Sequence, residues 1–167
     1  MIRCDVIMKK SNMPLQNFFK AFKFKARAAN TNKNTTEFLS GRELPGFRKK
    51  SFVLHFGGGE IWFEHLDGIY QYTELAIEKL CADSDFFCCP SAPSYITFVL
   101  DETVVTDELI FTIAEKLKNS GKQFVRVAFV GTDRKAKNNL KKYLIGNGFA
   151  VDFFGGIESA KEWLIPV

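Results

Sequence analysis

The sequence is short of the side chains that most often build reactive centres. It has only two histidines and four cysteines among 167 residues. The four cysteines, Cys4, Cys81, Cys88 and Cys89, do not have the spacing of a disulfide framework or a metal site. With so few histidines, a Ser-His-Asp or Cys-His catalytic set is hard to assemble. We therefore expect a non-enzymatic protein that uses no metal and no cofactor.

Long apolar runs are also missing. No stretch approaches the roughly 18 consecutive apolar residues that a membrane-spanning helix needs. The N-terminus lacks the continuous apolar core of a secretory signal. Because the sparse cysteines also suit a reducing compartment, we expect a cytoplasmic protein.

Acidic residues are nearly absent from the start of the chain. Residues 1–36 carry eight basic residues and one acidic residue, a net charge of +7, whereas the remainder carries 15 basic and 18 acidic residues, a net charge of −3. The positive charge therefore belongs to the N-terminal segment. Charge asymmetry of this kind points to an acidic partner, a membrane surface or a nucleic acid.

A basic amphipathic helix is predicted over residues 14–29, because apolar residues recur there at helical spacing and basic residues fall mostly on the other face. The element singled out from it comprises Phe18, Phe22, Lys20, Lys23 and Arg27. Three roles stay open: packing on its own domain, binding a protein partner or membrane surface, and binding nucleic acid. The acidic remainder disfavours nucleic acid. We treat residues 1–50 as an N-terminal extension, with residues 41–50 irregular.

From Ser51 onward, the pattern predicts one α/β domain over residues 51–167. The predicted strands cover residues 51–56, 60–66, 95–100, 124–130 and 150–154. The predicted helices cover residues 72–82, about 107–119, about 134–145 and 157–164. Alternating strands and helices imply right-handed crossovers and a mostly parallel sheet, to which the opening hairpin adds an antiparallel strand. The expected order is ββαβαβαβα, with a loop over residues 83–94.

The predicted hairpin carries both histidines and a glycine run. His55 and His65 lie on opposite strands, where they could pair across the hairpin, although two histidines alone make a poor metal site. The glycines at 57–59 lack the following helix and the GK[ST] signature of a phosphate-binding loop. A hairpin turn is the preferred interpretation.

A family resemblance rests on short motifs in the second half of the chain. The motif VAFVGTD at 127–133 is followed by VDFF at 151–154 and ESAKEWL at 158–164, and the earlier strand ITFVLD ends at Asp101. Over about residues 51–166 the chain resembles the SpoIIAA-like branch of the STAS fold. The resemblance implies a regulatory module that binds a protein partner and is switched by phosphorylation at the start of a helix. A related branch of the fold binds lipids in an apolar cavity.

Thr106 is the hydroxyl at the helix start that corresponds to that phosphorylated position. Neighbouring Asp107 and Glu108 would repel a phosphate there, whereas the helix N-terminus would favour it. The candidate ligand or partner surface gathers polar residues expected at the carboxyl edge of the sheet, where open α/β sheets place ligands. It comprises Asp101, Thr103, Thr106, Asp107, Thr132 and Asp133. The alternative is that these residues only cap helices and bind loop amides.

The sequence therefore leads to two functional hypotheses. The first is a regulatory protein–protein interaction domain of the SpoIIAA-like, STAS type. The second is a small-ligand binding protein, for a lipid or a nucleotide, with an apolar pocket rimmed by the same edge residues.

Overall fold

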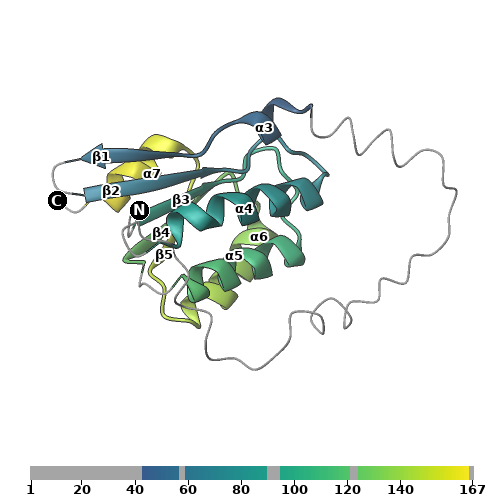
Figure 1. The fold of residues 1–167 in the computed structure, drawn as a ribbon. Coiled ribbons are helices and arrows are strands. Elements are labelled where there is room, and N and C mark those ends of the chain that lie inside the picture. Colours follow the sequence, from purple (N-terminus) through teal and green to yellow (C-terminus); the bar gives the residue numbers. More distant parts are fainter. Residues whose placement is uncertain (1–42, 57–58, 90–94, 121–123, 166–167) are drawn as a thin grey trace, which may run out of the picture. The chain divides into compact units, whose positions relative to one another are not determined.

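A computed structural model describes residues 43–56, 59–89, 95–120 and 124–165. The predicted helix over residues 14–29, with its five singled-out side chains, lies outside the described residues. In chain order the described elements (Figure 1) are α3 (Pro45–Arg48), β1 (Phe52–Phe56), β2 (Gly59–His65), α4 (Thr73–Phe87), β3 (Tyr95–Val99), α5 (Asp107–Asn119), β4 (Arg126–Val130), α6 (Arg134–Ile145), β5 (Val151–Phe154) and α7 (Ile157–Leu164).

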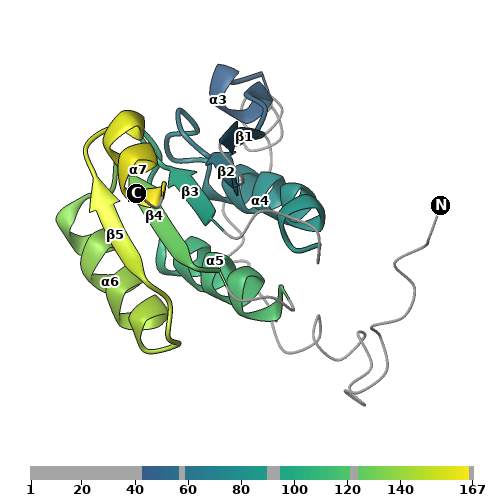
Figure 2. The same ribbon diagram turned by 90° about the vertical axis from the view of Figure 1, so that its left-hand side faces the viewer.

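The described strands form one mixed sheet in the order β1-β2-β3-β4-β5. β1 pairs with β2 in antiparallel fashion, and every later pair is parallel. The predicted α/β class with a mixed sheet is confirmed. Because strand order in the sheet follows strand order in the chain, right-handed crossovers bring α4, α5 and α6 to the same face. Figures 1 and 2 show these three helices on one side of the sheet and α7 on the other.

The two faces of the sheet bury two separate cores. Side chains alternate along each strand, so Trp62, Ile96 and Phe98 pack under α4, α5 and α6. Ile61 and Phe63 point the other way and pack with α7. The apolar residues that recur at helical spacing in α5 and α6 are the ones that these helices bury, namely Leu109, Ile110, Ile113, Ala114, Leu117, Ala136, Leu140 and Leu144.

An aromatic ladder crosses the helix-covered face of the sheet. Phe98 of β3 stacks on Phe129 of β4 with ring centroids 5.2 Å apart, and Phe129 stacks on Phe153 of β5 at 5.4 Å. The three residues are direct cross-strand partners in the parallel register. Stacked aromatic pairs across strands stabilise a sheet by more than the apolar area that they bury. The ladder therefore favours the observed register of β3, β4 and β5.

Two segments are more regular than the sequence predicted. α4 continues five residues beyond the predicted end at Ala82, because Phe87 is fully buried and Lys79 pairs with Asp83 one turn later. The start of the predicted 83–94 loop is therefore helical, and that part of the prediction is wrong. The segment predicted as irregular before Ser51 contains α3, where Gly46 packs so closely on the Asp67 carbonyl that a Cβ would lie 2.2 Å from it.

The two histidines do not pair across the hairpin. The register places His55 opposite Glu60, whose Oε1 lies 3.0 Å from His55 Nδ1. His65 is at the far end of β2, where its Nδ1 lies 2.8 Å from Asp67 Oδ1. The antiparallel register separates the two rings by the length of the hairpin, which the pairing hypothesis did not take into account.

Replacement of Phe129 by alanine tests the ladder. We expect Phe129→Ala to lower the free energy of unfolding by about 3–5 kcal/mol, because it leaves a cavity between two stacked rings. Urea denaturation followed by circular dichroism measures this loss. Phe111→Ala is the control, because Phe111 is 51% exposed. A similar loss of unfolding free energy in both variants would show that the stacked rings contribute no more to stability than an exposed phenylalanine.

Candidate functional site

The polar residues predicted at the carboxyl edge lie in the loops that follow β3 and β4 or, for Asp107, at the first residue of α5, and two of them cap helices. Thr106 Oγ1 accepts a hydrogen bond from Leu109 N at 3.3 Å and caps α5. Asp133 Oδ1 accepts one from Ala136 N at 2.7 Å and caps α6. Exposed Asp107 accepts a hydrogen bond from Asn139 Nδ2 at 2.9 Å, which links α5 to α6.

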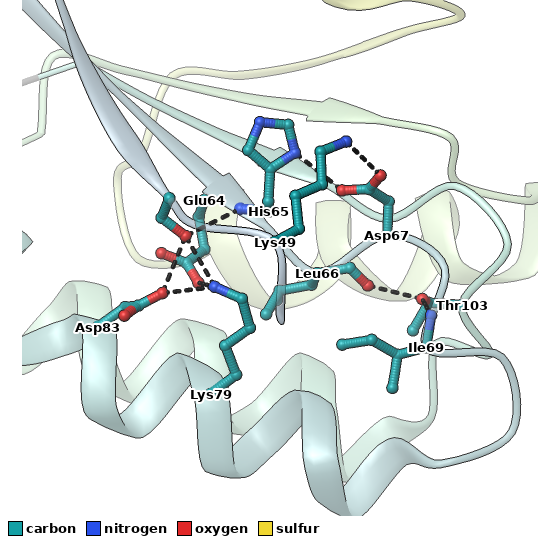
Figure 3. Close-up of polar contacts among 10 residues, drawn as sticks. Lys49, Glu64, His65, Leu66, Asp67, Ile69, Lys79, Asp83 and Thr103 are labelled. Carbon is teal, nitrogen blue, oxygen red and sulfur yellow. Dashed lines mark hydrogen bonds and ion pairs between the residues drawn. The ribbon is translucent and has the colours of Figure 1, made fainter. Parts of the chain in front are cut away.

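Thr103 is a buried clasp between two loops. Its hydroxyl donates to the Leu66 carbonyl at 2.6 Å and accepts from Ile69 N at 3.0 Å (Figure 3). The hydroxyl thus uses its donor and an acceptor lone pair on the backbone between β2 and α4. It holds the loop rather than facing an open surface.

The loops after β3 and β4 meet at Asp101 and Gly131. Gly131 has a φ of +76°, and a Cβ there would lie 2.3 Å from Asp101 Oδ1, so only glycine allows this approach. Asp101 is exposed and Thr132, next to Gly131, is half-buried. The structure thus brings Asp101 close to the β4 loop, while Thr103 is tied to the β2 side.

A pocket lies elsewhere, between α3, the segment leading into β1, and the second half of α4. Its volume is about 420 Å³, within the usual range for small-ligand sites. Aromatic and basic side chains dominate the lining, which is formed by Phe47, Arg48, Lys49, Lys50, Ser51, Trp62, Glu78, Lys79, Ala82, Asp83 and Phe86. None of these residues belongs to the predicted carboxyl-edge surface.

One end of the pocket is lined by the polar side chains of Ser51, Lys79 and Asp83, and Glu64 lies behind them with its Oε1 3.8 Å from Lys79 Nζ. We call these four residues the polar floor. Lys79 Nζ donates to Asp83 Oδ2 at 2.7 Å and to Ser51 Oγ at 3.0 Å (Figure 3). Ser51 in turn donates to Asp83 Oδ2 at 2.8 Å. These contacts join the start of β1 to the middle of α4.

Glu64 is the unusual member of the polar floor. It is fully buried, and its Oε2 accepts a hydrogen bond from Trp62 Nε1 at 2.8 Å. Its Oε1 lies 3.8 Å from Lys79 Nζ and has no hydrogen-bond partner among the described residues. A buried polar atom without a partner costs free energy, so this oxygen calls for an explanation.

Burial decides the protonation state of Glu64. Loss of hydration raises its pKa to about 8, and the nearby Asp83 charge adds to this, although the Trp62 hydrogen bond and the Lys79 charge oppose it. Burial also opposes ionisation of Asp83, but hydrogen bonds from Lys79 and Ser51 outweigh it and lower the pKa of Asp83. At neutral pH the polar floor therefore holds a neutral carboxylic acid beside a lysine–aspartate ion pair.

Aromatic rings form one wall of the pocket. The Phe86 ring stacks on Trp62 with centroids 6.3 Å apart and planes 10° from parallel. Trp62 is 8% exposed and belongs to the core, whereas Phe86 is 65% exposed. A large exposed aromatic ring beside a pocket is a surface suited to flat apolar ligands.

Lys49 connects the basic rim of the pocket to the end of β2. Its Nζ donates to Asp67 Oδ2 at 2.7 Å, and Asp67 also contacts the His65 ring (Figure 3). Burial alone would raise the pKa of Asp67, but these hydrogen bonds and the Lys49 charge lower it to about 2. The ion pair fixes the segment after α3 against the sheet.

The sequence contained a signal for the buried pair of Glu64 and Lys79, although not for the pocket. Alternate residues of a strand share a face, so Glu64 lies on the same face as Trp62 and Leu66, which would place a carboxylate among apolar side chains. Lys79 follows Leu75 by one helical turn and lies within the buried stripe of α4. A charged residue on each of two buried faces is the pattern that could have identified the pair.

Comparisons with known proteins find no match. No family model matches the chain, and no curated protein or solved structure is significantly similar to it. In the part of the chain that the structure describes, no helix is long and apolar enough to cross a membrane. Within the same residues, no group of three His, Cys, Asp or Glu side chains could hold a metal ion.

Replacement of Glu64 by glutamine tests its protonation state. The folded-state pKa of about 8 lies above the ordinary value of 4.5, so wild-type stability contributed by this group falls as pH rises from 4.5 to 8. A glutamine side chain at this position would keep an acceptor for Trp62 and would not titrate. We expect the stability of Glu64→Gln relative to wild type to rise by about 1–3 kcal/mol between pH 5 and pH 8.

Urea denaturation at both pH values measures the change, and Glu162→Gln on the exposed side of α7 is the matched control. A stability difference for Glu64→Gln that does not depend on pH would contradict the assignment of a neutral Glu64.

Proposed function

We propose that this protein binds a small molecule in the pocket between α3 and α4, without a chemical reaction. The observation that carries the proposal is the polar floor, where Ser51, Lys79 and Asp83 line the pocket and the fully buried Glu64 carboxyl group lies behind them, 3.8 Å from Lys79 Nζ. Replacing a largely buried ion pair such as Lys79–Asp83 by apolar residues is often neutral or stabilising. A fold gains little stability from this arrangement, and a binding site is where perturbed buried groups gather.

The walls of the pocket support the same function. Exposed Phe86 stacked on Trp62 offers apolar ring surface, and the polar floor offers a few fixed hydrogen-bonding groups. Ligand pockets combine these two features, with apolar walls for affinity and convergent polar atoms for orientation. This proposal corresponds to the small-ligand hypothesis from the sequence, at a place that the sequence did not indicate.

A neutral aromatic probe tests the proposed function. We expect 2-naphthol to perturb the backbone amide resonances of Ala82, Asp83 and Phe86 in a two-dimensional NMR titration. Phe86→Ala should weaken binding at least about fivefold, because it removes one stacking wall, while Phe111→Ala on α5 should bind like wild type. Unperturbed pocket resonances, or equal binding by Phe86→Ala, would rule out a ligand site here.

A second candidate function is the regulatory protein–protein interaction that the STAS resemblance implies. It is favoured by an unusual loop contact near the carboxyl edge. Tyr70 and Glu102 both have positive φ values, +55° and +56°, and Tyr70 N donates to the Glu102 carbonyl at 2.8 Å. Paired residues in this sparsely populated region are frequent at functional sites. Tyr70 and neighbouring Val104 are 45% and 53% exposed, which offers apolar surface to a partner.

Partner capture from the native cell tests this second function. A protein retained by wild type and by Phe111→Ser, but lost by the Tyr70→Ser, Val104→Ser double variant, would support an interaction surface at this edge. Equal capture by wild type and the double variant would contradict it.

The phosphorylation switch that the resemblance implies would act on the start of α5. Phosphorylation of Thr106 would have to displace the hydrogen bond that its side chain accepts from Leu109 N, which would loosen the first turn of that helix.

A further inference from the structure

We propose that the pocket selects a planar aromatic ligand that carries an anionic group, such as a carboxylate or a phosphate. This proposal rests on the proposed function and names the chemical class of the ligand. It combines the aromatic wall with the distribution of charge around the rim and the polar floor.

The aromatic part of the ligand has a defined place. Phe86 is held on Trp62 with nearly parallel planes, and Phe47 lines the pocket from the α3 side. A flat ring that contacts Phe86 and Phe47 would cover apolar surface that is now exposed to water. Contacts between aromatic rings contribute beyond the area that they bury, so a flat ligand gains more than a flexible aliphatic chain of equal size.

The charge of the lining favours an anion. Four cationic side chains line the pocket against two carboxylates, Glu78 and Asp83, and one of the cations, Lys79, is paired with Asp83. Two of the cations have partners outside the lining, since Arg48 pairs with Glu43 and Lys49 with Asp67. Lys50 makes no ion pair within the described residues and stands at the rim as an exposed cation. A positive rim raises the local concentration of anions and speeds their entry.

The Arg48 pair does not block this role. Both of its side chains are largely exposed, 61% for Arg48 and 71% for Glu43. Exposed ion pairs contribute little and exchange readily. An anionic ligand can therefore compete with Glu43 for the guanidinium, which is suited to hold a carboxylate or phosphate through two hydrogen bonds.

The polar floor makes anion binding sensitive to pH. The groups that face Glu64 are Trp62 from its own strand, Ser51 from the segment before β1, and Lys79 and Asp83 from α4. With Glu64 neutral, the charges of Lys79 and Asp83 balance. When Glu64 ionises, the polar floor gains a negative charge that repels an anion in the pocket.

Three probes with the same ring and different charge test the ligand class. They are 2-naphthoate, neutral 2-naphthamide and cationic 2-naphthylmethylammonium, measured at pH 6.5 by NMR titration of the full chain. We expect 2-naphthoate to bind at least about fivefold more tightly than the other two. Equal or tighter binding of the cation, still weakened by Phe86→Ala, would overturn the anionic ligand class and leave the proposed function standing. Failure of all three probes to perturb pocket resonances would overturn the proposed function itself.

Charge reversal at the rim provides the matched variants. Lys50→Glu should weaken 2-naphthoate at least about fivefold and leave 2-naphthamide unchanged. Lys142→Glu on α6, an exposed site outside the pocket lining, should bind both probes like wild type. Equal effects of the two reversals on 2-naphthoate would show a general charge effect and overturn the role of the rim.

The pH dependence gives a second readout that a purely structural role would not move. Wild type should bind 2-naphthoate about fivefold more weakly at pH 9 than at pH 6.5, whereas Glu64→Gln should show the same affinity at both values. Identical pH profiles in wild type and Glu64→Gln would overturn the part assigned to the polar floor.

Discussion

The alternation of side chains along β2 is the constraint on which the rest of the structure depends. β2 pairs with β1 on one side and β3 on the other, and both of its faces are buried. Ile61 and Phe63 therefore enter the core under α7, while Trp62 and Glu64 point to the layer under α4. A shift of one residue would exchange the two sets and place Glu64 against α7, away from Lys79.

The position of Glu64 then shapes its surroundings. A carboxylate in a helix-covered face must be neutralised, paired or protonated, because an isolated buried charge is too costly. Trp62 donates a hydrogen bond to one oxygen of Glu64, and burial keeps the Glu64 carboxyl group protonated. Lys79 therefore makes its hydrogen bonds with Asp83 and Ser51. Those bonds join Asp83 to the preceding turn of α4 and to Ser51, the residue before β1. The same contacts that accommodate one acidic residue thus form the end of a pocket.

The sequence predicted the elements of the fold better than the site. Strand and helix periods identified α5, α6 and α7 almost to the residue, because each has a clear apolar stripe and a recognisable start. The end of α4 was missed because Asp83 resembles a helix stop, whereas its bond to Lys79 and the burial of Phe87 continue the helix. Tertiary contacts of this kind lie outside the reach of local pattern.

The pocket was missed for a related reason. Its residues come from three separate segments, around Lys49, Trp62 and Lys79, and no spacing in the sequence connects them. The carboxyl edge was the natural expectation, since the rule for open parallel sheets points there. The cap of α5 by Thr106 and of α6 by Asp133 could be anticipated from their positions. The role of Thr103 could not be anticipated, because its hydroxyl bonds to the loop after β2 and that contact depends on the tertiary structure.

The carboxyl edge of the sheet and the pocket beside α4 differ in how many of their polar groups are already bonded within the fold. At the carboxyl edge, the Thr103 hydroxyl and the capping oxygens already bind backbone groups, so a ligand there would compete with bonds that hold the fold. In the pocket, Lys50 is exposed and has no ion-pair partner among the described residues. A ligand that contacts the Lys50 ammonium group breaks no existing ion pair of the described residues, and the exposed Phe86 ring gains a contact. Binding free energy is therefore easier to obtain beside α4 than at the edge that sheet topology favours.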